Sequence, residues 1–172
     1  MVTLVKETGA GLTNSNSYAN LSDGNTYHEM RLHVDDWTNA SDSDREKALM
    51  WATRLLDDMV EWNGRKTDDD QALDWPRYNI YDKDGYYIPH GTIPQDIIDA
   101  TCELARTLLA EDITGTPDTL GFSYIRAGDV AVNVDKRDRD SVFIISDLVE
   151  AMVRPYGSVN PRTAMEAKLI RT

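Results

Sequence analysis

The segment from residue 62 to residue 109 constrains the fold more than any other part of the chain. Two tryptophans, Trp62 and Trp75, flank an acidic loop, and each lies close to a residue that restricts the backbone. Gly64 follows a helical pattern, where a C-cap needs a residue that tolerates positive φ. Pro76 restricts the residue before it to extended conformations. We therefore expect both tryptophans to be buried and to hold the loop between them against a core.

Four segments have apolar residues at helical spacing. They lie near residues 22–33, 44–62 and 94–111, and between residues 146 and 155. Ser22 and Ser146 are candidate N-caps, Ser43 and Glu46 form a capping-box pattern, and Pro94 can open a helix at no cost in hydrogen bonds. The 94–111 helix has two adjacent apolar stripes, so we expect it to be central and to pack on the 44–62 helix. We expect its charged residues to lie in solvent: Asp96, Asp99, Glu103 and Arg106.

Alternating patterns predict a small amount of β-structure. Residues 78–88 form a hairpin pattern around an Asp-Lys-Asp-Gly turn, and residues 122–134 form a second one. Residues 2–6 suggest a short strand. The predicted fold class is α+β and mainly α, with a bundle of about four helices and one or two small β-hairpins. The predicted organisation is one domain over residues 1–157 and a C-terminal arm over residues 158–172.

The net charge, the single cysteine and the lack of long apolar runs argue against a nucleic-acid-binding protein, a disulfide-bonded protein and a membrane protein. The chain has 18 Lys and Arg residues against 30 Asp and Glu residues, a net charge of −12. Such a surface repels phosphate and disfavours nucleic-acid binding by broad charge neutralisation. The single cysteine, Cys102, allows no intrachain disulfide and is expected to be a buried thiol. No apolar run is long enough to span a membrane, so we expect a soluble protein made in a reducing cytoplasm.

The sequence contains no motif typical of catalysis or metal binding. His28 and His33 are five residues apart, so a helix would place them on different faces, and we interpret both as surface residues. Gly9 and Gly11 lack the Gly-Lys-Ser/Thr of a phosphate loop and are interpreted as an ordered turn. The acidic run 68–70 is interpreted as a solvated loop. We expect no enzymatic activity, no cofactor and no metal.

The order of motifs resembles that of the head–tail adaptor (connector) proteins of tailed bacteriophages. The resemblance is strongest to the branch labelled DnaT-like single-stranded-DNA-binding protein, and it covers roughly residues 1–157. The N-terminal part of the match is Glu7-x-Gly9-x-Gly11-Leu12-x-Asn14-x-Asn16-Ser17-Tyr18. The later residues that form the matched structural motif are Trp62, Gly64, Arg65, Trp75, Pro76, Arg77 and Pro94.

The resemblance implies a structural protein of the virion neck. Such a protein, made in the host bacterial cytoplasm, forms a ring of twelve copies under the portal protein and holds a tail, nozzle or stopper component. Genomic DNA passes through the lumen without specific binding, and no membrane is involved. The alternative is a single-stranded-DNA-binding replication accessory protein, which would need a basic groove with exposed aromatic residues.

Two features of the sequence leave alternatives open. Arg77 could form a bidentate bond to a carboxylate or could be a surface arginine of little consequence. The four tryptophans and eight tyrosines could stack nucleic-acid bases, although core and subunit-interface roles are the preferred interpretation.

Residues 158–172 form a net basic arm on an acidic chain. Met165, Leu169 and Ile170 are spaced for one face of a short helix, which alone would be marginal in water. We therefore expect an arm that orders only when it binds the portal, with an unimportant chain end as the alternative. The residues predicted to bind the portal are Tyr156, Pro161, Arg162, Met165, Lys168, Leu169, Ile170 and Arg171.

Overall fold

The computed structural model describes residues 2–113, 124–127, 130–133 and 145–159. The helices are α1 (Leu21–Glu29), α2 (Asp35–Asn39), α3 (Asp42–Met59), α4 (Gln95–Ala110) and α5 (Asp147–Val153). The strands are β1 (Val60–Trp62), β2 (Arg65–Lys66), β3 (Arg77–Tyr78), β4 (Ile80–Tyr81), β5 (Tyr87–Ile88), β6 (Tyr124–Ala127), β7 (Val130–Asn133) and β8 (Gly157–Val159). They pair into two-stranded antiparallel sheets, which confirms the predicted mainly α fold of the α+β class.

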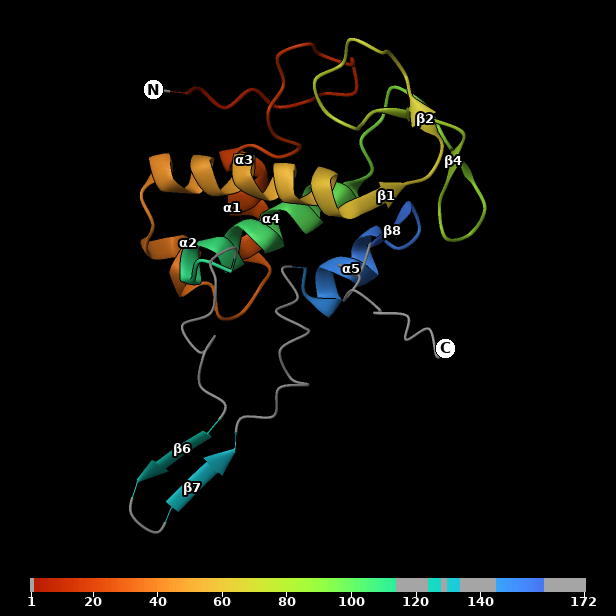
Figure 1. Ribbon diagram of the computed structural model, residues 1–172. Coiled ribbons are helices and arrows are strands. Elements are labelled where there is room, and N and C mark those ends of the chain that lie inside the picture. Colours follow the sequence, from red (N-terminus) through yellow and green to blue (C-terminus); the bar gives the residue numbers. More distant parts are fainter. Residues whose placement is uncertain (1, 114–123, 128–129, 134–144, 160–172) are drawn as a thin grey trace, which may run out of the picture.

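Helix α4 is the centre of the helical core. It contacts α1, α2, α3 and α5, and it lies beside α3 along most of its length (Figure 1). Its buried residues include Ile97, Cys102 and Leu104, which are at most 1% exposed. The expected pairing of the two longest helices and the buried thiol are therefore confirmed. No helix in the described part of the chain is both long and apolar enough to cross a bilayer.

The helix boundaries depend on capping residues that periodicity alone does not locate. Helix α1 begins after Asn20, whose side chain and that of Asp23 satisfy each other's backbone N–H groups, and not at Ser22 as predicted. Ser41 caps α3 by accepting from the Asp44 N–H, whereas Ser43, predicted to begin a capping box, lies inside the helix. Ser146 accepts from the Val149 N–H and caps α5, as predicted.

Three elements differ from the prediction. Helix α2 was not anticipated, because its five residues hold only one large apolar side chain, Trp37. Residues 2–6 form no strand but one isolated bridge between Lys6 and Ser17. Pro94, predicted at the first helical position, lies at the N-cap of α4, and the first helical residue is Gln95.

Helix α3 ends at Met59, and the chain then extends into β1. Strand β8 pairs with β1, with Trp62 opposite Gly157, so the segment after α5 returns to the end of α3. Gly64 is therefore not a helix C-cap, and its φ of 68° serves the turn between β1 and β2. A Cβ atom there would lie 2.0 Å from the Tyr78 carbonyl oxygen, so this turn requires glycine.

Both predicted hairpins are present, as β4–β5 and β6–β7. A third small sheet, β2–β3, joins Arg65 to Tyr78 across the acidic loop. Its strands have two residues each, too short for an alternating pattern to show in the sequence.

Candidate functional site

The segment between α3 and α4, residues 60–92, is called the lobe here. It projects from one end of the helical core (Figure 1). Trp75 fixes it there, because this side chain is fully buried and meets Trp62 and Tyr156 edge-on, at centroid distances of 5.8 Å and 5.9 Å. Trp62 is 8% exposed, so the predicted burial of both tryptophans is confirmed. The Trp75–Pro76 peptide bond is cis.

Asp57, near the end of α3, connects the lobe to the N-terminal segment. Its carboxylate accepts hydrogen bonds from the Tyr18 hydroxyl (2.6 Å), Trp62 Nε1 (3.3 Å) and the Asp74 backbone N–H (3.1 Å). Burial raises the pKa of Asp57 to about 7, although these hydrogen bonds act in the opposite direction. Burial, followed by the nearby Asp57 charge, raises the pKa of Tyr18. Sequence analysis missed this junction, because Asp57 looks like any solvated residue of α3.

Arg77 binds backbone carbonyl groups. Its guanidinium donates to the oxygens of Asn63 (2.7 Å), Asp74 (2.9 Å), Gly64 (3.3 Å) and Trp62 (3.5 Å). The guanidinium is neither bound to a carboxylate nor free at the surface, the two alternatives that the sequence left open. It binds backbone carbonyl oxygens of two chain segments. Arg77 thus ties the turn after β1 to the strand that follows Trp75.

Gln71 organises the acidic loop from inside. It is 4% exposed, and its Oε1 accepts from the Thr67 N–H (3.0 Å), the Thr67 hydroxyl (2.8 Å) and the Asp68 N–H (3.0 Å). Its Nε2 donates to the carbonyl oxygens of Leu73 (2.8 Å) and Pro76 (3.1 Å). The loop is therefore held by one amide side chain that satisfies five neighbouring groups.

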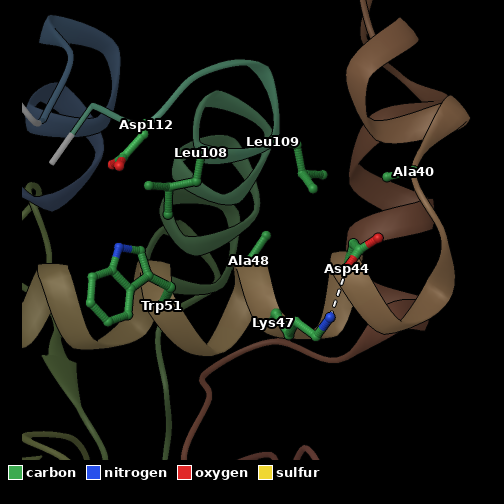
Figure 2. Close-up of a pocket in the computed structure, with 8 residues that line it drawn as sticks. All are labelled: Ala40, Asp44, Lys47, Ala48, Trp51, Leu108, Leu109 and Asp112. Carbon is green, nitrogen blue, oxygen red and sulfur yellow. Dashed lines mark hydrogen bonds and ion pairs between the residues drawn. The ribbon is translucent and has the colours of Figure 1, made fainter. Parts of the chain in front are cut away.

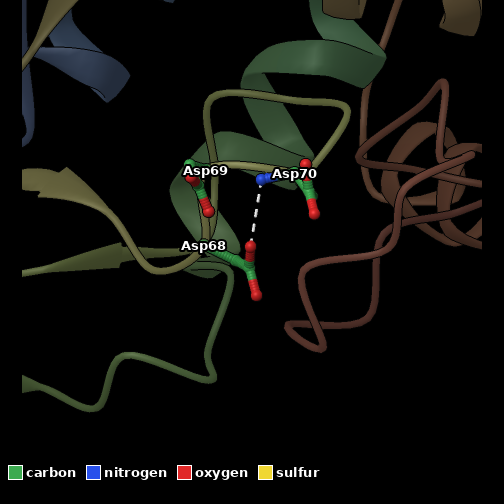
Figure 3. A group of neighbouring side chains, drawn as sticks. All are labelled: Asp68, Asp69 and Asp70. Atoms are coloured by element: carbon green, nitrogen blue, oxygen red, sulfur yellow. Dashed lines mark hydrogen bonds between the residues drawn. The ribbon is translucent and has the colours of Figure 1, made fainter.

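The carboxylates of Asp68, Asp69 and Asp70 lie close together and are exposed (Figure 3). The Asp70 backbone N–H donates to the Asp68 carboxylate at 3.0 Å, which is a local turn contact. No buried ligand accompanies them among the described residues. This arrangement agrees with the predicted solvated loop and does not define a metal site.

Gly9 and Gly11 enclose a side chain of their own chain. The buried Glu7 carboxylate accepts from the N–H groups of Gly9 (2.8 Å), Gly11 (3.1 Å) and Leu12 (2.8 Å) and from the Ser15 hydroxyl (3.0 Å). The predicted ordered turn is confirmed. The N–H groups that could meet a phosphate are occupied by this internal carboxylate.

The outer surface of the lobe is aromatic. Tyr81, Tyr86 and Tyr87 on the β4–β5 hairpin are 53%, 73% and 50% exposed, and Tyr81 meets Tyr87 edge-on at 5.8 Å. On the adjoining strand, the Arg65 guanidinium lies 5.5 Å from the centre of the Tyr78 ring. Such amphipathic rings suit either a protein partner or stacked bases.

The charge of the lobe separates these two possibilities. Residues 60–92 contain four basic and seven acidic residues, a net charge of −3. One of the basic side chains, Lys66, already pairs with Asp74 at 3.0 Å. The exposed aromatic surface therefore lacks the excess of cations that usually accompanies base stacking.

Two polar residues expected at the surface are buried. His28 is 3% exposed, between Tyr27 (5.0 Å) and Trp37 (4.7 Å), because the unpredicted helix α2 covers it. Burial lowers its pKa to about 4. Glu103 is 2% exposed, and its Oε1 binds Arg31 (2.7 Å) and Arg106 (2.8 Å). Both are structural contacts of the core.

The predicted arm begins inside the folded part of the chain. Ser158 and Val159 belong to β8. Tyr156 is 5% exposed, and its hydroxyl donates to Asp96 at 2.7 Å, so it is a core residue that cannot meet a partner without unpacking. The other residues assigned to the arm, from Pro161 to Arg171, lie outside the described residues.

The model of the family described as "Putative DnaT-like ssDNA binding protein" matches residues 2–172. The chain therefore belongs to this DnaT-like family. No curated protein matches the sequence, and no solved structure matches the fold.

Proposed function

We propose that this protein is a structural virion component: a head–tail adaptor that assembles as a ring under the portal protein. The observation that carries this proposal is the charge. The net charge is −12 for the chain and −3 for the lobe, so the most exposed aromatic surface is itself acidic. Such a surface repels phosphate, whereas a DNA conduit needs a wall that DNA can slide past.

The construction of the lobe supports a protein partner. Trp75, Arg77 and Gln71 fix its backbone, so the exposed tyrosines are presented from a rigid support. A rigid aromatic surface loses little conformational entropy on binding, and tyrosine is enriched at interface hot spots. We assign the lobe to contacts with a neighbouring copy or with a tail, nozzle or stopper component.

The ring is the part of the proposal that rests on the resemblance described above. Two different surfaces of one chain can associate head to tail, and such an interface closes into a ring when its rotation permits. Twelve copies and a place in the virion neck follow from the same resemblance, whereas contact of the arm with the portal is proposed from the net basic charge and the apolar spacing of its residues. We propose no catalytic activity and no cofactor.

A second candidate function is binding of single-stranded DNA in replication. The family description favours this candidate over the adaptor role, because it names single-stranded DNA and no assembly partner. Tyr81, Tyr86 and Tyr87 could stack bases, and Arg65 and Lys83 could contact phosphates. The acidic balance of the lobe opposes it.

The two candidates are separated by one pair of measurements on the same preparation. The full chain is mixed with the portal protein of the same genome and analysed by size-exclusion chromatography with light scattering. In parallel, it is titrated into fluorescent single-stranded DNA at about 50 mM and 150 mM salt, a range over which phosphate contacts weaken strongly. A variant with Tyr81, Tyr86 and Tyr87 changed to serine is the matched control for stacking.

The adaptor proposal expects a ring-sized complex with portal and no DNA binding at the higher salt concentration. DNA binding at that concentration that is lost in the tyrosine variant, without a portal complex, would replace it with the second candidate.

A further inference from the structure

Trp51, on the outer face of α3, is the tryptophan that the core does not cover. It is 42% exposed, whereas Trp37, Trp62 and Trp75 are at most 8% exposed. A hollow of about 610 Å³ lies beside it, between α3 and the end of α4 (Figure 2). Its apolar wall is formed by Ala40, Ala48, Trp51, Leu108 and Leu109.

A second hollow shares Lys47 and Trp51 with the first. It has a volume of about 750 Å³, and Val2, Met50 and Leu73 contribute apolar surface to it. Trp51 thus lines both hollows, and the surface formed by both is called the Trp51 groove here. Its apolar residues come from α3, α4, the N-terminal segment and the acidic loop, so packing of the core elements fixes its shape.

The charged residues around the Trp51 groove are mostly acidic. They comprise two basic residues, Lys47 and Arg54, and five acidic residues: Asp44, Asp57, Asp58, Asp74 and Asp112. Lys47 pairs with Asp44 at 2.8 Å, Arg54 lies 3.8 Å from Asp58, and Asp74 pairs with Lys66 at 3.0 Å. With Lys66 counted, three basic residues stand against five acidic ones, so the border keeps a net charge of −2. An apolar groove with an acidic border matches a segment that carries apolar side chains flanked by Lys or Arg.

We propose that the Trp51 groove binds the C-terminal arm of the same chain, residues 160–172, before the protein meets a partner. The arm has Arg162, Lys168 and Arg171 against one acidic residue, and it also has Met165, Leu169 and Ile170. Its composition is therefore the complement of the groove: apolar residues for the hollows and a net positive charge for the border.

The position of the last described residue places the groove within reach. Val159 pairs with Val60, which directly follows α3. Trp51 lies about 14 Å back along that helix, at 1.5 Å per residue. The arm, if extended, spans up to about 40 Å. A short tether also gives the arm an effective concentration on the order of millimolar, so a weak contact is sufficient.

The sequence predicted an arm that orders only when it binds the portal, whereas this proposal has the arm bound to the groove in the free protein. The physical reason is that a short amphipathic helix is marginal in water but is stabilised when its apolar face is covered. The groove supplies that cover within the same molecule. The inference concerns the free protein and does not depend on the proposed function.

The test uses the full chain with a spin label on the arm. Thr163→Cys provides the labelling site, since Cys102, the natural cysteine, is fully buried. The readout is the paramagnetic loss of the indole N–H signal of Trp51 in a ¹⁵N-labelled sample. We expect a loss of this signal that is independent of protein concentration.

Two arm variants test the chemistry of the contact. Reversing its charges with Arg162→Glu, Lys168→Glu and Arg171→Glu should restore the Trp51 signal, because the border of the groove is acidic. Glu166→Gln makes the arm more positive and should keep or deepen the loss. Circular dichroism melts of both variants check that the fold is unchanged.

A mixing experiment distinguishes the occupants. Spin-labelled unenriched chains are mixed with ¹⁵N-labelled chains that carry no label. A Trp51 signal that is also lost in this mixture, where the spin label and the ¹⁵N nuclei are on different chains, would assign the groove to the arm of a second copy and would overturn the proposal. A signal that persists in every sample would also overturn it and would leave the groove to a different segment or partner.

Discussion

At the scale of single residues, Trp75 is the side chain on which the lobe depends. It is fully buried, whereas Trp51 is 42% exposed, so the chain offers a matched pair of tryptophans. We expect Trp75→Ala to lower the free energy of unfolding by about 3–5 kcal/mol, because a large buried ring is lost and a cavity remains. Urea unfolding followed by circular dichroism measures it. Trp51→Ala is the control and should cost much less; equal losses would show that burial does not explain the role of Trp75.

His28 makes stability depend on pH through the same core. Its pKa of about 4 in the folded protein lies below its ordinary value of 6.5, because burial penalises the charged ring. Its contribution to stability is therefore fully present above pH 6.5 and is lost as the pH falls towards 4. Replacing it with Phe should flatten this part of the pH profile.

Urea midpoints at pH 7 and pH 5 measure this dependence in the wild type and in His28→Phe. His33, one of the two exposed histidines, supplies the control substitution, His33→Phe. If the wild type and His28→Phe lose the same stability between the two pH values, His28 is not the source of the pH dependence.

The sequence predicted the burial of some core residues and missed the burial of others. Trp62, Trp75 and Cys102 were predicted to be buried because apolar character and spacing reveal burial directly. His28 and Glu103 were placed in solvent, since their burial depends on α2 and on Arg31, which are distant in the sequence or not visible as patterns. Polar residues satisfied by tertiary partners leave no periodic signal.

Among the elements, four helices were predictable and the five-residue helix α2 was not. Helices α3 and α4 have enough turns for an apolar stripe to stand out, and they were located within a few residues. Helix α2 and the sheet β2–β3 are too short for any period to show. The end of α3 was missed by three residues because β8 pairs with Val60 to Trp62, a contact that no local pattern encodes.

The hydrogen bonds of Arg77 hold the backbone of the lobe, and their loss has a predictable effect. Its guanidinium binds four carbonyl oxygens at once, whereas a lysine ammonium has only three donors on a single nitrogen. We expect Arg77→Lys to loosen the lobe locally, with faster hydrogen exchange at the Thr67 amide, which donates to the Pro76 carbonyl oxygen. Loss of charged hydrogen bonds of this kind costs about 1.5–3 kcal/mol each.

Arg65→Lys is the control for this measurement, because Arg65 is an exposed residue of the same small sheet that stacks on Tyr78. Hydrogen exchange at Thr67 should hardly change in this variant. Equal protection of Thr67 in wild type and Arg77→Lys would mean that Gln71 alone holds the loop.

At the scale of the whole molecule, charge and shape bear on function more directly than any single motif. The chain is acidic, and it has an exposed aromatic lobe at one end and an apolar groove on its longest helix, two separate surfaces that we propose for contacts with protein segments. The family match describes single-stranded DNA binding, so the physical argument and the description of the family point in different directions. That disagreement gives the portal and DNA measurements their discriminating power.

The last prediction concerns deletion of the C-terminal arm and its effect on binding to the portal. Deletion of residues 160–172 leaves β8 and its pairing with β1 complete, so the melting curve should match that of the full chain. If the arm engages the portal, the same deletion should abolish co-purification with portal, because several arms bind one ring together and a weak contact is amplified by their number. The charge-reversed arm, with Arg162, Lys168 and Arg171 changed to glutamate, is the matched variant that keeps the chain length. A truncated protein that still fills the portal ring would place the docking surface on the folded domain, with the lobe as the next surface to mutate.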